Sequence, residues 1–160
     1  MRTMRMALTM ALLALPGQAA AQSPSVAILP FQSGGAFARG GADTGTMERE
    51  LAASLTRELA GLARPVSGAD LERALAGVSL GTEGRMDAGS AAKVGAALGA
   101  THVVAGTFMD HFGKIRLDAR VIEVKSGRAV KTVSAGPGDR SEVPAMVRRL
   151  AEQVRAAVGG

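Results

Sequence analysis

Two histidines and two aspartates are the residues in this chain best suited to metal binding or acid–base catalysis. His102 and His111 lie at opposite ends of an apolar segment, with Asp110 and Asp118 close by in the sequence. If the segment is a strand, its rise of about 3.3 Å per residue separates the histidines by roughly 30 Å. They therefore cannot share a metal ion. We expect His102 to be a packing residue with one satisfied ring nitrogen, and Asp110 and His111 to belong to a turn.

A glycine-rich loop from Gly34 to Gly41 lies between a predicted strand and a predicted helix, where phosphate-binding loops occur. It lacks GxGxxG spacing, and no Gly-Lys-Ser/Thr sequence closes it. We favour a flexible surface loop that offers Phe37 and Arg39 to a protein partner, because aromatic and Arg side chains dominate binding hot spots. The alternative is a small-ligand or nucleotide-binding domain that uses the same loop.

The serines form no hydrolytic motif. None of them stands in a GxSxG sequence, and those near predicted turns or helix starts are Ser90, Ser126, Ser134 and Ser141. No pair of carboxylates stands out either. We therefore expect no catalytic site, no metal site and no cofactor, and a protein that is not an enzyme.

Basic residues gather in the C-terminal half. Arg116 and Arg120 belong to a predicted strand, and four more basic residues lie nearby: Lys114, Lys125, Arg128 and Lys131. The default interpretation is a solvated strand face, because exposed charges by themselves contribute little. The alternative is an anionic partner, a cell-wall or outer-membrane polymer, that binds the Arg116/Arg120 region.

The first 21 residues have the layout of a secretory signal peptide. Arg2 and Arg5 supply positive charge, an apolar run follows, and small residues precede Gln22. We expect cleavage between Ala21 and Gln22, and a single periplasmic or secreted domain over residues 22–160. The apolar run is shorter than the roughly 20 residues that span a bilayer, and no later run is long enough.

The composition narrows the remaining functions. At 160 residues the chain has room for one domain. It has no cysteine, so we expect core burial rather than disulfides to stabilise it, and no lipid attachment. Loss of the leader lowers the net charge from +5 to about +3. With 2% aromatic residues and neither Trp nor Tyr, nucleic-acid binding has little support.

Hydrophobic periodicity predicts the N-terminal elements. We expect a buried strand at 26–29, a helix from an N-cap at Thr46 to about residue 63, a brief strand at 65–66, and a short helix that starts at Ser67. A small-residue helix at 88–98 should end at Gly99, because glycine adopts the left-handed conformation at low cost.

The C-terminal half predicts three antiparallel strands. Residues 102–109 are apolar on both faces, which indicates cover on both sides. Alternation at 115–121 indicates a half-buried strand, and a third strand follows at 129–135. We expect residues 136–138 to break the chain and Ser141 to cap a long amphipathic helix. The fold class is then α/β: a mixed sheet of four or five strands, flanked by three or four helices.

The order and spacing of these elements resemble a known group of envelope domains. The stretches VAILPF, AAKVGAALGATHVVAGTF and KIRLDARVIEVKSGRAV are similar to the domain shared by CsgG, FlgO, LpoB and the N-terminal part of TolB. A typical Gly-Ala-(Asp/Thr)-(Tyr/His)-Val-Val-x-Gly pattern falls on residues 99–106, and a Val-Asp-x-x-x-Gly turn falls on 122–127. The resemblance implies a non-catalytic scaffold domain of the cell envelope that acts through contacts with envelope proteins.

Overall fold

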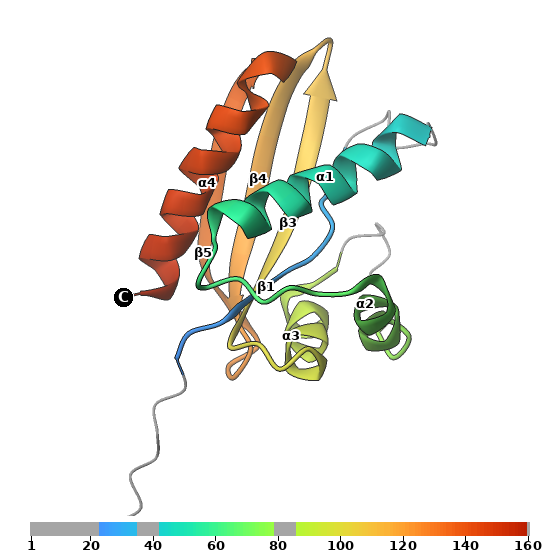
Figure 1. Cartoon of the computed structure of the whole chain (residues 1–160), viewed down its shortest axis with the longest axis vertical. Coiled ribbons are helices and arrows are strands. Elements are labelled where there is room, and N and C mark those ends of the chain that lie inside the picture. Colours follow the sequence, from blue (N-terminus) through green and yellow to red (C-terminus); the bar gives the residue numbers. More distant parts are fainter. Residues whose placement is uncertain (1–22, 35–41, 79–85, 160) are drawn as a thin grey trace, which may run out of the picture.

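The structure, a computed structural model, describes residues 23–34, 42–78 and 86–159 (Figure 1). Within these ranges the chain forms a mixed α/β fold in which a five-stranded sheet is flanked by four α-helices. The predicted fold class is confirmed, including the C-terminal meander and the long final helix.

The strands of the described residues fall into an order that the sequence left open. They are β1 (Val26–Ile28), β2 (Gln32–Ser33), β3 (His102–His111), β4 (Lys114–Glu123) and β5 (Arg128–Asp139). The order across the sheet is β1-β3-β4-β5, and β2 also pairs with β3. β1 and β2 run parallel to β3, whereas β3, β4 and β5 form an antiparallel meander.

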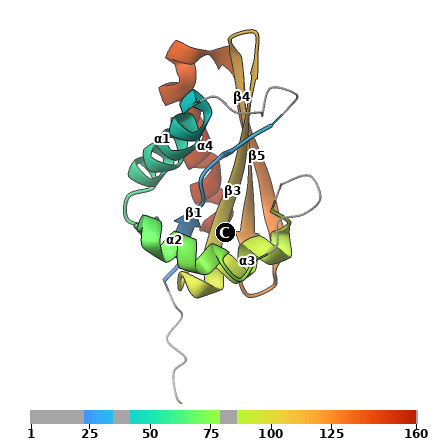
Figure 2. The same ribbon diagram turned by 90° about the vertical axis from the view of Figure 1, so that its right-hand side faces the viewer.

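Helices pack on both faces of the sheet. α1 (Ala42–Glu58) and α4 (Val143–Val158) share a core with one face, and α2 (Gly68–Leu75) and α3 (Ala88–Ala97) share a core with the other. Figure 2 shows α1 and α4 on one side of the sheet and α3 on the other. In both views α3 lies at the bottom of the sheet, far from the turn that joins β3 to β4.

The first half of β3 is the centre of the fold. Val103 and Val104 are fully buried, and they belong to the two different cores. The predicted cover on both faces is thus confirmed for this half. It is wrong at Met109, which is exposed because α3 does not reach it. The prediction that Asp110 and His111 belong to a turn is also wrong, because both residues extend β3.

Glycine allows two close approaches to β3. A Cβ atom on Gly95 of α3 would lie 2.2 Å from Val103 Cγ2, and one on Gly106 would lie 2.3 Å from the Phe31 ring. Atoms cannot come this close, so both positions require the absence of a side chain. The small-residue composition of this region is therefore a packing requirement.

The strand alternation in β4 and the apolar stripe in α4 are confirmed. Ile115, Leu117, Ala119 and Val121 are at most 2% exposed. The buried side chains of α4 are Met146, Val147, Leu150, Ala151, Val154 and Val158. These two sets belong to the same core, so the sheet and the C-terminal helix stabilise each other.

Two predicted helix starts are wrong and one is confirmed. α1 begins at Ala42, so Thr46 lies inside the helix rather than at its cap. Ser141 lies in a 3-10 turn, Arg140–Glu142, that precedes α4; there the Asp139 amide donates to Glu142 Oε2 at 3.3 Å. Ser67 does cap α2, since its Oγ accepts from the Asp70 amide at 3.1 Å.

Two extended segments also differ from prediction. The expected strand at 65–66 is absent from the described residues, and the pairing there is a single bridge from Val26 to Ala63. Residues 136–138 do not break the chain, because β5 continues to Asp139. The ladder shifts register between Ile115 and Leu117, and this bulge accommodates a proline that has no amide hydrogen to donate.

Candidate interaction surface

Several residues expected to mark a site lie outside the described part of the chain. These are Ala21, Gln22, Phe37 and Arg39, together with all of the glycine-rich loop except Gly34. The Gly34 amide donates to the Phe108 carbonyl at 2.8 Å. Its Cα carries no side chain, and a Cβ there would lie 3.2 Å from Met109 Cγ. The loop therefore starts beside the exposed end of β3.

The two histidines lie at the two ends of β3, as the sequence predicts. His102 Nδ1 lies 3.0 Å from Thr101 Oγ1. Burial lowers the pKa of His102, and the charge of Glu123, its neighbour across the sheet, partly opposes this shift. The packing interpretation of His102 fits these contacts. Among the described residues, no group of three His, Asp or Glu side chains is placed to hold a metal ion.

The turn between β3 and β4 carries a phenylalanine in an unusual conformation. Phe112 and Gly113 form a two-residue loop with φ angles of +52° and +83°, and the Gly113 amide donates to Asp110 Oδ1 at 2.8 Å. Such turns favour Asn-Gly or Asp-Gly, because a bulky side chain at positive φ costs about 1 kcal/mol or more.

The Phe112 side chain recovers little of this cost. It is 92% exposed, and its ring makes an edge-to-face contact with His111, at 5.5 Å between centroids. By contrast, Phe31 and Phe108 are at most 5% exposed. The fold therefore gains almost nothing from an aromatic side chain at position 112. We refer to residues 109–114 as the hairpin tip.

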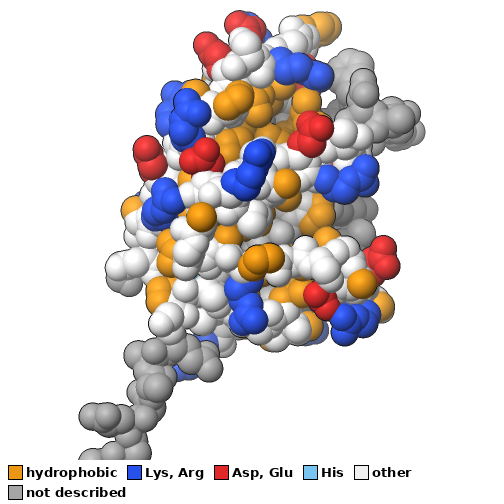
Figure 3. Space-filling view, in the orientation of Figure 1, with side chains coloured by type: hydrophobic (Ala, Val, Ile, Leu, Met, Phe, Trp, Pro, Cys, Tyr) orange, Lys and Arg blue, Asp and Glu red, His pale blue; other side chains and the backbone are white. Residues whose placement is uncertain are grey.

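Charges around the hairpin tip are balanced. Lys114 Nζ lies 2.8 Å from Asp139 Oδ1, and Arg140 Nη2 lies 4.0 Å from Asp110 Oδ2. Figure 3 shows acidic and basic side chains intermixed over the α1 and α4 face, with hydrophobic side chains visible among them. An exposed aromatic ring with a near-neutral rim suits an apolar pocket on a protein better than a polyanion.

The charge of the basic strand face is compensated in part, because Arg116 forms an ion pair with Asp118. The guanidinium of Arg116 donates to both oxygens of Asp118 at 2.9–3.1 Å, and Ser134 Oγ donates to the same carboxylate at 2.7 Å. Burial raises the pKa of Asp118, but these hydrogen bonds and the Arg116 charge outweigh it and lower the pKa. Arg120 Nη2 donates to the Met86 carbonyl at 2.6 Å. Both arginines thus have partners within the chain.

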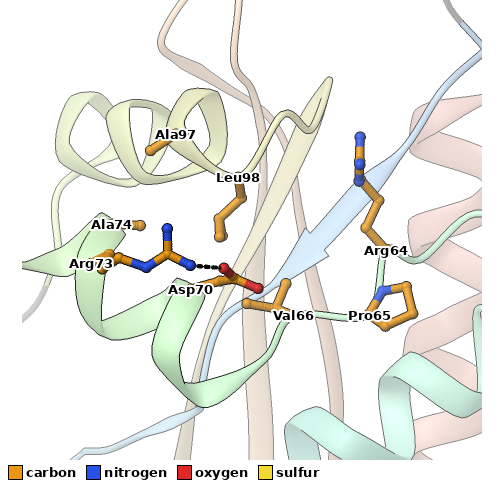
Figure 4. Close-up of a pocket in the computed structure, with 8 residues that line it drawn as sticks. All are labelled: Arg64, Pro65, Val66, Asp70, Arg73, Ala74, Ala97 and Leu98. Atoms are coloured by element: carbon orange, nitrogen blue, oxygen red, sulfur yellow. Dashed lines mark hydrogen bonds and ion pairs between the residues drawn. The ribbon is translucent and has the colours of Figure 1, made fainter.

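A polar pocket of about 420 Å³ lies between the α1–α2 linker, α2 and the end of α3 (Figure 4). Arg73 forms an ion pair with Asp70 on α2, and Arg64 Nη1 donates to the Gly99 carbonyl at 2.8 Å. In Figure 4 the Arg64 side chain extends from the linker on the far side of Leu98 from Arg73. The two cations do not converge on a common point, so the pocket is a weak anion site.

The sequence analysis does not single out the hairpin tip as a candidate site. The sequence predicts a turn at 110–113, whereas in the structure β3 continues to His111 and the turn itself consists of Phe112 and Gly113. The available signal was the residue before Gly113: a phenylalanine where an asparagine or aspartate suits the turn.

No protein-family model matches the chain, and no curated protein matches it. No helix of the described residues has the length and apolar character needed to cross a membrane. Among solved structures, lipoprotein GNA1162 from Neisseria meningitidis is 17% identical over 74% of this chain and 84% of that one, with a TM-score of 0.48. TolB from Acinetobacter baumannii is 15% identical over 86% of this chain and 28% of that one, with a TM-score of 0.46.

The LpoB C-terminal domain from Escherichia coli is 17% identical, and the match covers 69% of this chain and 79% of that one. Its TM-score is 0.51, which is a likeness of fold. The chain therefore has the fold of the LpoB C-terminal domain, as the motifs at residues 99–106 and 122–127 implied.

Proposed function

We propose that this protein is an exported, non-catalytic interaction domain of the cell envelope that binds another envelope protein through its hairpin tip. Residues 1–21 would be removed as a signal peptide between Ala21 and Gln22, which leaves residues 22–160 as the working domain in the periplasm or outside the cell. Phe112 is the observation that carries the proposal. Its ring is exposed and its backbone is strained, so its presence is best explained by a partner.

The likeness to the LpoB C-terminal domain supports the envelope setting. The position of Gly34 supports the choice of surface, because Gly34 lies against Met109 at the same end of the sheet as the hairpin tip. Phe37 and Arg39 follow Gly34 closely in sequence, so we include them in the proposed contact area. The balanced charges near Phe112 favour a protein over an anionic polymer.

Site-specific photocrosslinking in the native host tests this proposal. A benzophenone-bearing phenylalanine replaces Phe112 in one strain and exposed Lys93 on α3 in another, as the matched control. We expect one discrete crosslinked protein from position 112, found in the envelope fraction, and none from position 93. Equal crosslinking at both positions, or protein retained in the cytosol with its leader uncut, would refute the proposal.

The two alternatives predict different results. Nucleotide binding at residues 34–41 predicts that nucleotides raise the melting temperature, and that replacing Gly40 and Gly41 abolishes the shift. Binding of an anionic polymer to the Arg116/Arg120 region predicts sedimentation with lipopolysaccharide or cell-wall material that salt reverses. We do not expect the first result, because the loop lacks the spacing of phosphate-binding motifs. We do not expect the second, because Arg116 and Arg120 already have partners within the chain.

A further inference from the structure

A second, apolar pocket of about 300 Å³ lies just beyond the carboxyl end of β1. The segment that follows β1 contributes Leu29 and Phe31, α2 contributes Leu71 and Leu75, and β3 contributes Ala105. In open α/β sheets, ligands bind outside the carboxyl ends of parallel strands. The volume is at the lower end of the range for small-molecule sites, about 300–1,000 Å³.

The walls of this pocket include apolar side chains that the core buries only in part. Leu71 and Leu75 lie four residues apart on one side of α2, and both are only half-buried. Ala105 on β3 is also half-buried, and its short side chain leaves the space open. Next to it, Gly106 lets the Phe31 ring pack directly on the strand. The pocket is thus open where the short side chain of Ala105 on β3 lies in the same apolar cluster as Leu71 and Leu75 on α2.

The charged group that lines this pocket is a carboxylate. Glu48 of α1 contributes to the lining, and its Oε1 accepts from the Ser33 amide at 3.2 Å. Among the described residues, no Lys or Arg forms an ion pair with Glu48. The nearby guanidinium of Arg120 is held by the Met86 carbonyl. Among the described residues that line the pocket there is no Lys or Arg, so a negative charge on the ligand would be repelled by the Glu48 carboxylate.

We propose that this pocket binds a small, mainly apolar molecule that carries an N–H donor and no negative charge. The apolar walls bury the body of the ligand, and Glu48 accepts its N–H. This proposal does not depend on the hairpin tip, which joins β3 to β4 and contributes no residue to the pocket.

Two dyes with the same aromatic skeleton test the proposal on the purified protein. N-phenyl-1-naphthylamine is neutral and has one N–H; 1-anilinonaphthalene-8-sulfonate adds a sulfonate. We expect saturable, one-to-one fluorescence enhancement by the neutral dye, and binding of the sulfonate at least about tenfold weaker. Glu48→Gln should reduce this difference. No saturable binding of the neutral dye, or equal affinity for both dyes, would overturn the proposal.

Variants that fill the pocket test whether the dye binds there. Ala105→Leu should weaken binding of the neutral dye at least about tenfold, whereas Ala129→Leu, on the exposed part of β5, should not change it. Circular dichroism and melting temperature establish that each variant folds. If Ala105→Leu does not fold, Leu75→Gln on the half-buried face of α2 replaces it, with the same expected loss. Unchanged affinity in a folded pocket variant contradicts the assignment.

Discussion

The two ends of β3 are built on the same strand and have opposite character. At the start, Val103 and Val104 are fully buried against helices on the two faces of the sheet. At the end, Met109 is 36% exposed and Phe112 beyond it is 92% exposed. The first end has a complete explanation in packing. The second has an aromatic residue that packing does not explain.

This contrast separates residues that the fold requires, such as Val103 and Val104, from Phe112, which the fold does not require. Buried positions tolerate change poorly, because a filled core leaves no space and a cavity is costly. The hairpin tip should tolerate change well in stability and poorly in function. Substitutions at the two ends can therefore confirm or break the comparison.

The largest loss of stability is expected in the core that joins the sheet to α4. Leu150 is fully buried there, and Leu150→Ala should reduce the free energy of unfolding by about 2–5 kcal/mol. Urea denaturation followed by circular dichroism measures the change. A loss below about 1 kcal/mol would mean that α4 is not part of a filled core.

A smaller loss is expected at Gly106. Gly106→Ala places a Cβ atom where the Phe31 ring lies, so we expect a loss of about 1–3 kcal/mol. Gly45→Ala is the matched control, because nothing lies within 4 Å of its Cβ position and alanine favours a helix by roughly 0.5–1 kcal/mol. The two substitutions should shift the urea midpoint in opposite directions. Equal shifts would contradict the close approach of Phe31.

At the hairpin tip we expect a substitution to increase stability rather than reduce it. Phe112→Asn should raise the free energy of unfolding by about 1 kcal/mol, because asparagine tolerates the left-handed conformation that phenylalanine resists. Thermal denaturation of wild type and variant measures the gain. A clear loss of stability would show that the Phe112 ring supports the fold, and it would remove the main argument for a partner.

The smallest expected effect comes from His102. Burial lowers its pKa below the ordinary value of 6.5, so the unfolded chain binds the proton more readily than the folded one. Above pH 6.5 His102 is neutral in both states and does not reduce stability. As the pH falls through 6.5, the unfolded chain takes up the proton first, so the folded protein loses stability. Between pH 7.5 and 5.5 the wild type should therefore lose more stability than His102→Gln. An equal loss in both proteins would mean that His102 is not desolvated.

The sequence was informative where one local pattern decides the outcome. Alternation marked β4, and the stripe from Met146 to Val158 marked α4, because each element buries one face of a regular repeat. The sequence predicts that the third strand ends before Gly136, because its continuation through a proline depends on a bulge opposite Arg116 that only the partner strand reveals.

The candidate sites depend on contacts that are distant in sequence. The apolar pocket brings together Leu29, Leu71 and Ala105, and no window of sequence contains all three. The turn at Phe112 was predicted, but the exposure of its ring follows from the distance between the hairpin tip and α3. Local pattern therefore predicted the elements, and their assembly determined which side chains remain exposed.

The central claim is that Phe112 serves a partner rather than the fold. The most direct test compares wild type and Phe112→Asn for the size of the complex that each forms in gently solubilised envelopes, with melting temperature measured on the same two proteins. We predict that the variant melts at a higher temperature and leaves the large complex for the free form. A variant that stays in a complex of the same size and abundance as the wild type would contradict the claim.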